Sequence, residues 1–357
     1  MNATRTIGPA IAWTASLLQL ASFAAPAERA AADPIPVRVA VVVTFEVGAD
    51  RGDKPGEFQY WVEREDWTRR ITVPGVDHPV LTDGGGTIGV VAGTTVRAAN
   101  QLMALVMSGM FDFSRTYWVI NGIAGVNPDV ASIGSAAWAR YVVDGDVAYE
   151  IDSREADPTW PYGIIPVGSS APNQKPSGHD WQYDTMAYPL NPSLVEWAYS
   201  LTKATPIPDS DQMKACRAAY VGFPNAQKPP FVLIGDSFDS CRFWYGRAMN
   251  RWAEDWTRLW TEGKGEYAMS AMEDQGFAAA LKRLSGMGRI DFQRVLFLRT
   301  GSDYCMPPPG SETRDNINTD YPGYLSALEA AYRVGSRVTH ELAAHWDLYR
   351  DRIPAPN

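Results

Sequence analysis

Four segments of this 357-residue chain carry carboxyl groups or glycines at or near the ends of predicted secondary structure elements. Ligands of α/β sheets bind beyond the carboxyl ends of the strands, so these segments are where chemistry is expected. The four are Glu46 after the first strand, residues 121–125, residues 270–276 and residues 299–303.

The two segments nearer the N-terminus each allow two interpretations. Glu46 follows a β-branched run at 37–43, and a carboxylate there can activate water or hold a sugar, although a solvated loop glutamate would have the same sequence. Residues 121–125 are Asn-Gly-Ile-Ala-Gly after the apolar run at 117–120. Their glycines would let the backbone approach a ligand and offer N–H donors, or would form an ordinary tight turn. The segment is neither G-x-G-x-x-G nor a Walker loop.

The two segments nearer the C-terminus are acidic. Glu273 lies in Ser-Ala-Met-Glu-Asp-Gln-Gly and can accept hydrogen bonds from two neighbouring hydroxyls of a ribose. Alternatively, Glu273 and Asp274 only stabilise a helix N-terminus. Asp303 ends Arg-Thr-Gly-Ser-Asp and can protonate a leaving group, a role that requires partial burial to raise the pKa of its carboxyl group. An aspartate that caps the next segment is the simpler alternative.

Alternating strands and helices are expected to position these segments. Strands are predicted at 37–43, 89–92, 117–120, 231–234 and 294–298, with a strand, a turn at 144–146 and another strand within 136–151. Helices are predicted from a cap at Thr94 or Thr95 to about Met110, and at 192–203, 249–261, 269–284 and 324–349. This order predicts one α/β domain over 37–357, with a central mixed, mostly parallel sheet flanked by helices on both faces. An irregular insertion is expected near 156–230.

The first 27 residues have the order of a secretory signal peptide. Arg5 precedes an uncharged stretch from Ile7 to Phe23, and small residues around Ala25 offer a cleavage site. An uncleaved anchor is the alternative, because 17 uncharged residues lie at the lower limit of a spanning helix. We expect residues 1–27 to be the signal peptide, residues 28–36 a flexible lead-in, and the mature protein to be exported, in the periplasm or outside the cell, without a span of its own.

Composition excludes some partners. The 32 Lys and Arg against 41 Asp and Glu give a net charge of −9, so the chain lacks the basic surface that nucleic acid requires. The four histidines have no zinc-ligand spacing, and neither a metal nor a cofactor is expected. Cys216 and Cys241 are the most local cysteine pair, with Cys305 left over, but sequence does not decide whether they form a disulfide.

Together, the motifs resemble one family. The segments N-G-I-A-G, A-M-E-D-Q and R-T-G-S-D occur in the order found in nucleoside phosphorylases and nucleosidases. The stretch from 121 to 155 with Y-E-I-D-S-R-E, the G-D-S around Asp236, and L-R-T-G-S-D ahead of P-P-P-G resemble the purine nucleoside permease family more closely. That resemblance covers nearly the whole mature chain and implies a nucleoside phosphorylase-like fold with a purine nucleoside as ligand.

The resemblance also implies roles for individual residues. Met272 and Glu273 would hold the ribose, while Asp303, oriented by Ser302, would face N7 of the purine. The remaining substrate-binding positions would line the sugar and anion side of the pocket: Asn121, Gly122, Ile123, Ala124, Gly125, Gly93 and Thr94.

Two departures favour water over phosphate as the attacking group. Ile123 stands where phosphorylases commonly have a serine that contacts phosphate, and Ile120 stands where an arginine is common. Losing charge-assisted donors to phosphate should cost about 1.5–3 kcal/mol each. We therefore expect cleavage of the N-glycosidic bond by hydrolysis, with Glu46 as base, and phosphate as co-substrate only if Arg51 or Arg97 substitutes.

Two other functions remain open at this point. The chain could be a non-catalytic binding component that delivers nucleosides to a separate transporter, or a scaffold without a ligand. Relatives of this fold often assemble, so a homo-oligomer is also open.

Overall fold

The computed structural model describes residues 33–177, 183–317 and 321–356. The chain divides between Asp33 and Pro34, and residues 34–357 form one compact unit. The predicted signal peptide lies outside the described residues, so export stays a prediction. Within the described part, no helix is long and apolar enough to cross a membrane.

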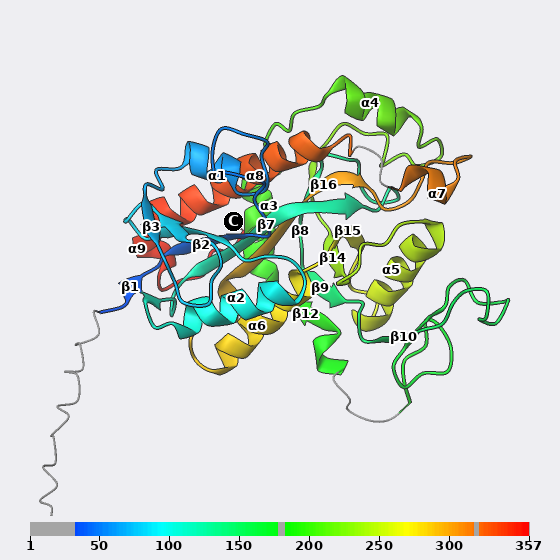
Figure 1. Cartoon of the computed structure of the whole chain (residues 1–357), viewed down its shortest axis with the longest axis horizontal. Coiled ribbons are helices and arrows are strands. Elements are labelled where there is room, and N and C mark those ends of the chain that lie inside the picture. The colour runs from blue at the N-terminus through cyan, green and yellow to red at the C-terminus, as the bar shows by residue number, and fades with distance from the viewer. Residues whose placement is uncertain (1–32, 178–182, 318–320, 357) are drawn as a thin grey trace, which may run out of the picture. The chain divides into compact units, whose positions relative to one another are not determined.

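A large mixed β-sheet forms the centre of residues 34–357, as predicted (Figure 1). Its main path runs β12-β9-β14-β15-β7-β2-β5-β4-β3, while β16 pairs with β7 and β8, and β8 pairs with β13. The central pairs β5–β2, β2–β7 and β7–β16 are parallel, whereas β3, β4 and β12 at the edges pair in antiparallel fashion. The strands of this sheet are β2 (Val39–Val43), β3 (Arg69–Ile71), β4 (Val80–Thr82), β5 (Thr87–Val91), β7 (Tyr117–Val126), β8 (Ala136–Trp138), β9 (Tyr141–Asp144), β12 (Ala187–Pro189), β13 (Val232–Ile234), β14 (Asp236–Asp239), β15 (Tyr267–Ala271) and β16 (Val295–Tyr304).

Strands β7 and β16 are much longer than their apolar runs predict. The sequence placed their ends at 120 and 298, but the two strands stay paired in parallel up to Val126 and Tyr304. Residues 121–125 and 299–303 are therefore paired strand segments rather than loops beyond the sheet. The prediction failed because the apolar run ends before the hydrogen-bonded ladder does.

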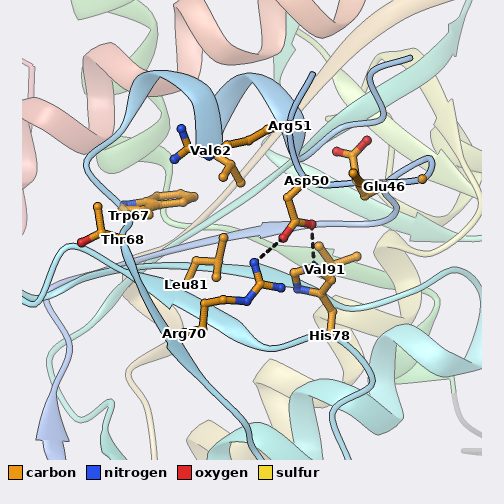
Figure 2. A pocket seen from close by; sticks show the side chains of 12 residues that line it. Glu46, Asp50, Arg51, Val62, Trp67, Thr68, Arg70, His78, Leu81 and Val91 are labelled. Atoms are coloured by element: carbon orange, nitrogen blue, oxygen red, sulfur yellow. Dashed lines mark hydrogen bonds and ion pairs between the residues drawn. The ribbon is translucent and has the colours of Figure 1, made fainter. Parts of the chain in front are cut away.

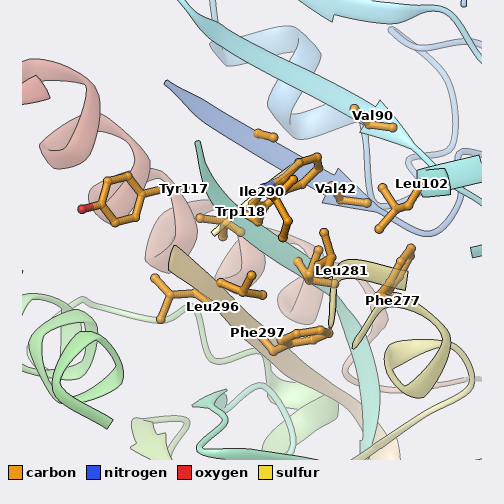
Figure 3. Close-up of a cluster of buried hydrophobic side chains, with 14 of the residues drawn as sticks. Val42, Val90, Leu102, Tyr117, Trp118, Phe277, Leu281, Ile290, Leu296 and Phe297 are labelled. Carbon is orange, nitrogen blue, oxygen red and sulfur yellow. The ribbon is translucent and has the colours of Figure 1, made fainter. Parts of the chain in front are cut away.

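Helices cover both faces of the sheet, as predicted. Helix α8 (Tyr324–Ala344) packs on β7 and β16, and α1 (Gln59–Arg64) packs on α8. Helices α2 (Val96–Met107) and α6 (Asp274–Gly286) pack together on the opposite side in Figure 1. Apolar side chains of these two helices meet the strands in the main core, which Figure 3 shows for Leu102, Leu281, Val42, Val90, Trp118 and Phe297.

The other helices are α3 (Pro192–Thr202), α4 (Asp211–Ala218), α5 (Arg247–Trp260), α7 (Thr313–Asn316) and α9 (Trp346–Tyr349). Helix α3 confirms the prediction for 192–203. Its N-terminus is capped by Asn191, whose side chain accepts hydrogen bonds from Ser193 N and Leu194 N.

Two helix predictions are wrong in detail. The helix expected over 269–284 begins only at Asp274, because the apolar residues before it form the buried strand β15 between β14 and β7. Thr95 precedes α2 with a φ of 54° and forms no side-chain cap, so neither threonine caps that helix by its hydroxyl group.

Several smaller features concern the expected lead-in, insertion and disulfide. Ile35–Pro36, at the end of the expected lead-in, form β1 and pair with β6 (Phe111–Asp112). The region 156–230 contains α3, α4, β12 and β11 (Ile164–Pro166), which pairs with β10 (Ala148–Glu150). All three cysteines are free, so the Cys216–Cys241 disulfide left open by the sequence is not present.

Candidate active site

A single buried arginine holds three carboxyl groups at the end of the central sheet. Arg299 on β16 is 2 % exposed, and its Nε donates to both carboxylate oxygens of Asp274, at 3.1 and 3.0 Å. Its guanidinium group also forms an ion pair of 2.8 Å with Glu273 and lies 3.8 Å from Glu57. One positive charge cannot balance three negative ones, so burial favours the protonated form of at least some of these acids.

Glu57 is the carboxyl group that the sequence did not predict. Its two oxygens accept hydrogen bonds of 2.7 Å from the backbone N–H groups of Thr44 and Ile123. Burial raises the pKa of Glu57 to about 7, Arg299 opposes that rise, and the nearby Glu273 adds to it. A carboxyl group that titrates near neutral pH and is held by backbone donors is suited to general-base catalysis.

Glu273 lies next to Glu57, at the start of α6. Its Oε1 accepts a hydrogen bond of 2.9 Å from Thr44 Oγ1 and pairs with Arg299. Among the described residues, Oε2 of Glu273 has no hydrogen-bond partner. Burial raises the pKa of Glu273, and Arg299 opposes this. Glu273 is therefore held by the protein through one oxygen, Oε1.

Asp303 has a much simpler environment. A β-bulge places Ser302 and Asp303 opposite the single residue Gly125 of β7. Ser302 Oγ donates to Asp303 Oδ1 at 2.7 Å and lies 3.1 Å from the carbonyl oxygen of Ala124. Burial raises the pKa of Asp303 to about 7, while the bond from Ser302 lowers it. Such a group is protonated often enough at neutral pH to act as a general acid.

Three consecutive residues of β7 join these two carboxyl environments. Ile123 N–H binds Glu57, the Ala124 carbonyl oxygen lies 3.1 Å from Ser302 Oγ, and a Cβ at Gly125 would lie 4.0 Å from Asp303 Oδ2. Positions 123 and 125 of a strand are about 7 Å apart. The Glu57–Glu273 group and Asp303 therefore adjoin nearby positions of one strand, and a single cavity between Glu273 and Asp303 stays a prediction.

Glu46 is placed differently from the role that the sequence suggested. Its carboxylate accepts hydrogen bonds from the backbone N–H groups of Val47, Gly56 and Phe58 and so ties together the loop after β2. Figure 2 shows Glu46 at the edge of a cavity of about 890 Å³, where Asp50 binds Arg70 and His78. The structure thus gives Glu46 a loop-holding position and puts Glu57 against the buried arginine.

The other predicted positions fall into two groups. Asn121 is used by the protein itself, because its side chain donates to Ala331 O at 3.0 Å and accepts from Trp61 Nε1 at 3.4 Å. Gly122 is adjacent to the charged cluster, and a Cβ there would lie 2.3 Å from Arg299 Nη1 and 2.5 Å from Glu57 Oε1. Only glycine therefore fits at 122.

Three more predicted positions lie near the charged cluster. Gly93 N donates to the carbonyl oxygen of Thr44 at 2.9 Å, so Gly93 and the adjacent Thr94 lie beside the threonine that holds Glu273. Met272 is half-buried between β15 and α6, directly before Glu273.

A fourth acid, Asp239, lies beside Asp274 of the cluster. It is fully buried at the end of β14, and neither carboxyl oxygen has a hydrogen-bond partner in the described part of the chain. Burial and the adjacent Asp274 raise the pKa of Asp239 well above its usual value. Among the described residues, no group of three or more Asp, Glu, His or Cys side chains is arranged to hold a metal ion.

Comparison with known families identifies the family of the chain. The sequence model described as purine nucleoside permease matches residues 36–354, which is nearly all of the described chain. The chain belongs to the purine nucleoside permease family.

Curated members of the family are similar over most of their length. A protein of Candida albicans named purine nucleoside permease is 29 % identical over 297 residues, which cover 80 % of this chain and 72 % of that protein. A Schizosaccharomyces pombe protein named probable purine nucleoside permease is 29 % identical over 259 residues, covering 71 % of this chain and 74 % of that protein.

Solved structures show the fold of this purine nucleoside permease family member. A 5′-methylthioadenosine/S-adenosylhomocysteine nucleosidase of Colwellia psychrerythraea, in complex with adenine, aligns with a TM-score of 0.50 and 14 % identity over 86 % of this chain and 96 % of that chain. The corresponding nucleosidase of S. pneumoniae also aligns with a TM-score of 0.50, at 15 % identity over 86 % and 99 % of the two chains. The fold is therefore that of the nucleoside phosphorylases and nucleosidases, as the motifs predicted.

Proposed function

We propose that this member of the purine nucleoside permease family binds a purine nucleoside and hydrolyses its N-glycosidic bond. The observation that carries the proposal is the placement of two carboxyl groups beside β7, Glu57 at Ile123 and Asp303 at Gly125. The pKa of each of these carboxyl groups is raised to about 7. A buried pair of this kind supplies one base and one acid at neutral pH. The names of the family's relatives and the nucleosidase fold support a nucleoside as the ligand.

Glu273 and Asp303 would hold opposite ends of the nucleoside. Oε2 of Glu273 would accept hydrogen bonds from the ribose hydroxyl groups, because Oε1 is already held by Thr44 and Arg299. Asp303, in its protonated form, would donate to N7 of the purine. This orientation directs the N-glycosidic bond across the stretch of β7 at 123–125.

Cleavage of the N-glycosidic bond then requires a proton transfer at each end of the site. Glu57 would take a proton from water, and the water oxygen would form a bond to C1′ of the ribose. The bond from C1′ to N9 breaks, its electron pair passes into the purine ring, and the proton of Asp303 goes to N7. The products are free ribose and free base, and the negative cluster around Arg299 stabilises the positive charge that develops on the sugar.

The electrostatics of the site favour water over phosphate. Glu57, Glu273 and Asp274 share one arginine, so a phosphate dianion beside them would meet net negative charge. Arg97, which could have substituted for a phosphate-binding arginine, is largely exposed and pairs with Asp77 at 3.0 Å. Ile123 uses its backbone N–H for Glu57 and has no side-chain donor for phosphate.

The alternative function is nucleoside binding without cleavage, as a component of nucleoside uptake. The names of the Candida and Schizosaccharomyces relatives favour this alternative. It would require a separate transporter, and both this partner and a homo-oligomer stay predictions.

One assay separates the two functions. The protein is incubated with inosine or adenosine, with and without phosphate, and free base is measured by chromatography. Hydrolysis predicts free base without phosphate. Base released only with phosphate would mean phosphorolysis, and binding by calorimetry without base release would mean the uptake function. If the protein neither binds the nucleoside nor releases free base, the nucleoside proposal is refuted.

A further inference from the structure

A second cavity, of about 580 Å³, lies where α8 begins. Its size is within the range of roughly 300–1,000 Å³ that is typical of small-molecule sites. It is formed by the loop before α1, the start of α4 and the first turn of α8, and its lining includes Lys54, Gln212, Tyr321, Tyr324, Leu325 and Ser326.

The start of α8 is fixed directly against the acid end of the active site. Gly323 N donates to the carbonyl oxygen of Ser302 at 2.9 Å. A Cβ at Gly323 would lie 2.7 Å from that oxygen and 2.9 Å from the carbonyl oxygen of Gly301, so only glycine permits this approach. Tyr321, two residues earlier, is thereby held near Asp303, and the negative charge of Asp303 helps burial to raise the pKa of the Tyr321 hydroxyl group.

The same turn reaches the base end of the site. Tyr324 donates its hydroxyl hydrogen to the carbonyl oxygen of Pro55 at 2.9 Å, two residues before Glu57. Burial, then Glu57 and Glu46, raise the pKa of Tyr324 to about 12. Lys54 Nζ lies 5.6 Å from the centre of the Tyr324 ring.

Tyr321 and Tyr324 therefore line one cavity, with Tyr321 near Asp303 and Tyr324 bonded to the loop that carries Glu57. Tyr321 is 40 % exposed, which leaves an aromatic surface available for a flat ligand. We propose that this cavity holds the outer side of the bound purine nucleoside, with the base against Tyr321 and the sugar towards Tyr324. The proposal rests on the proposed function and adds recognition residues that the sequence motifs do not include.

The first test fills the cavity. Leu325 lines it and is 56 % exposed, so Leu325→Trp adds bulk without disturbing the core. Leu348→Trp on α9, where leucine is 54 % exposed, is the matched control. We expect Leu325→Trp to raise the Kd of inosine at least about tenfold and Leu348→Trp to leave it within about twofold, as measured by calorimetry. Circular dichroism of both variants reports their folding.

The second test concerns the aromatic ring of Tyr321. Tyr321→Ala should raise the Kd of hypoxanthine, the base alone, at least about fivefold, while Tyr321→Phe, which keeps the ring, stays within about twofold.

The outcomes separate this proposal from the proposed function. If the unaltered protein binds inosine but folded Leu325→Trp and Tyr321→Ala bind their ligands with unchanged Kd, the cavity proposal is overturned and the nucleoside function stands. If the unaltered protein binds no inosine, both are overturned.

Discussion

The two ends of the candidate site contain the same chemical group in opposite surroundings. Glu273 and Glu57 lie in a network of an arginine, a threonine and backbone N–H groups, with further acids close by. Asp303 has Ser302 as its only hydrogen-bond partner in the described part of the chain. A network fixes the positions of its members and couples their protonation, whereas an isolated carboxyl group is free to give its proton to a ligand. Under the proposed function, the network fixes Glu57 and Glu273 beside the sugar, and the less constrained Asp303 gives its proton to the purine.

The largest expected effect comes from removing the centre of the network. Arg299→Met leaves buried carboxylates without their positive partner and should lower the free energy of unfolding by about 3–5 kcal/mol, as measured by urea denaturation. Arg97→Met is the control, because Arg97 belongs to an exposed pair and its loss should cost about 1 kcal/mol or less. Equal losses in the two variants would contradict the network.

At the other end, Asp303→Asn should affect the reaction rather than the fold. An amide of the same shape cannot protonate the purine, so kcat for hypoxanthine release from inosine should fall by about 10²–10⁴-fold.

Asp303→Asn should also change how stability depends on pH. Burial raises the pKa of Asp303 from 3.8 to about 7, so the folded protein keeps a proton that the unfolded chain releases. The free energy of unfolding should therefore fall as the pH rises from about 4 to about 7. Asp303→Asn removes this contribution, and its stability relative to the unaltered protein should rise across that window. A constant difference between pH 4 and 8 would show that Asp303 titrates normally.

Glu57 and Glu46 allow a comparison within one loop. Glu57→Gln removes the base and should reduce the rate of hydrolysis about 10²-fold. The variant should also lose the increase of kcat/KM with pH that the pKa of about 7 of Glu57 predicts for the unaltered protein. Glu46→Gln keeps a side chain that can accept from the loop backbone, and kcat should stay within about threefold. The reverse result, with Glu46→Gln inactive and Glu57→Gln active, would restore the assignment made from sequence.

The smallest expected effect is that of Thr44→Val. This nearly isosteric change removes the hydroxyl bond to Glu273 but keeps the backbone bond to Glu57. A single hydrogen bond contributes about 0.5–1.5 kcal/mol, which corresponds to about a two- to tenfold rise in KM for inosine. Loss of kcat with unchanged KM would instead indicate that Thr44 acts on the transition state.

The elements of the fold could be predicted where local pattern decides them. The β-branched run that forms β2, the capped and periodic α3 and the long α8 all have such a pattern. The ends of β7 and β16 could not be predicted from the sequence. The apolar runs stop at the polar residues Asn121 and Arg299, but both residues are buried because the two strands stay paired beyond them. The predicted helix over 269–284 included the last three residues of β15, because the apolar run continues from the strand towards α6.

The site was predictable where motifs mark it. Glu273, Ser302 and Asp303 lie in motifs, and the structure brings them to one region of β7. Glu57 has no motif: it is one of several acids in a charged loop, and its partner Ile123 is 66 positions away. Its neighbours Gly56 and Phe58 give no local signal of burial beside Arg299.

Glu57 reaches the site on a loop, whereas Glu273, Arg299 and Asp303 are held on or beside strands of the sheet. A shift of that loop would withdraw the base and leave the ligand-holding groups in place. Under the proposed mechanism, binding and cleavage of a nucleoside thus depend on different parts of the chain: the sheet supplies the groups that hold the ligand, and the loop supplies the base.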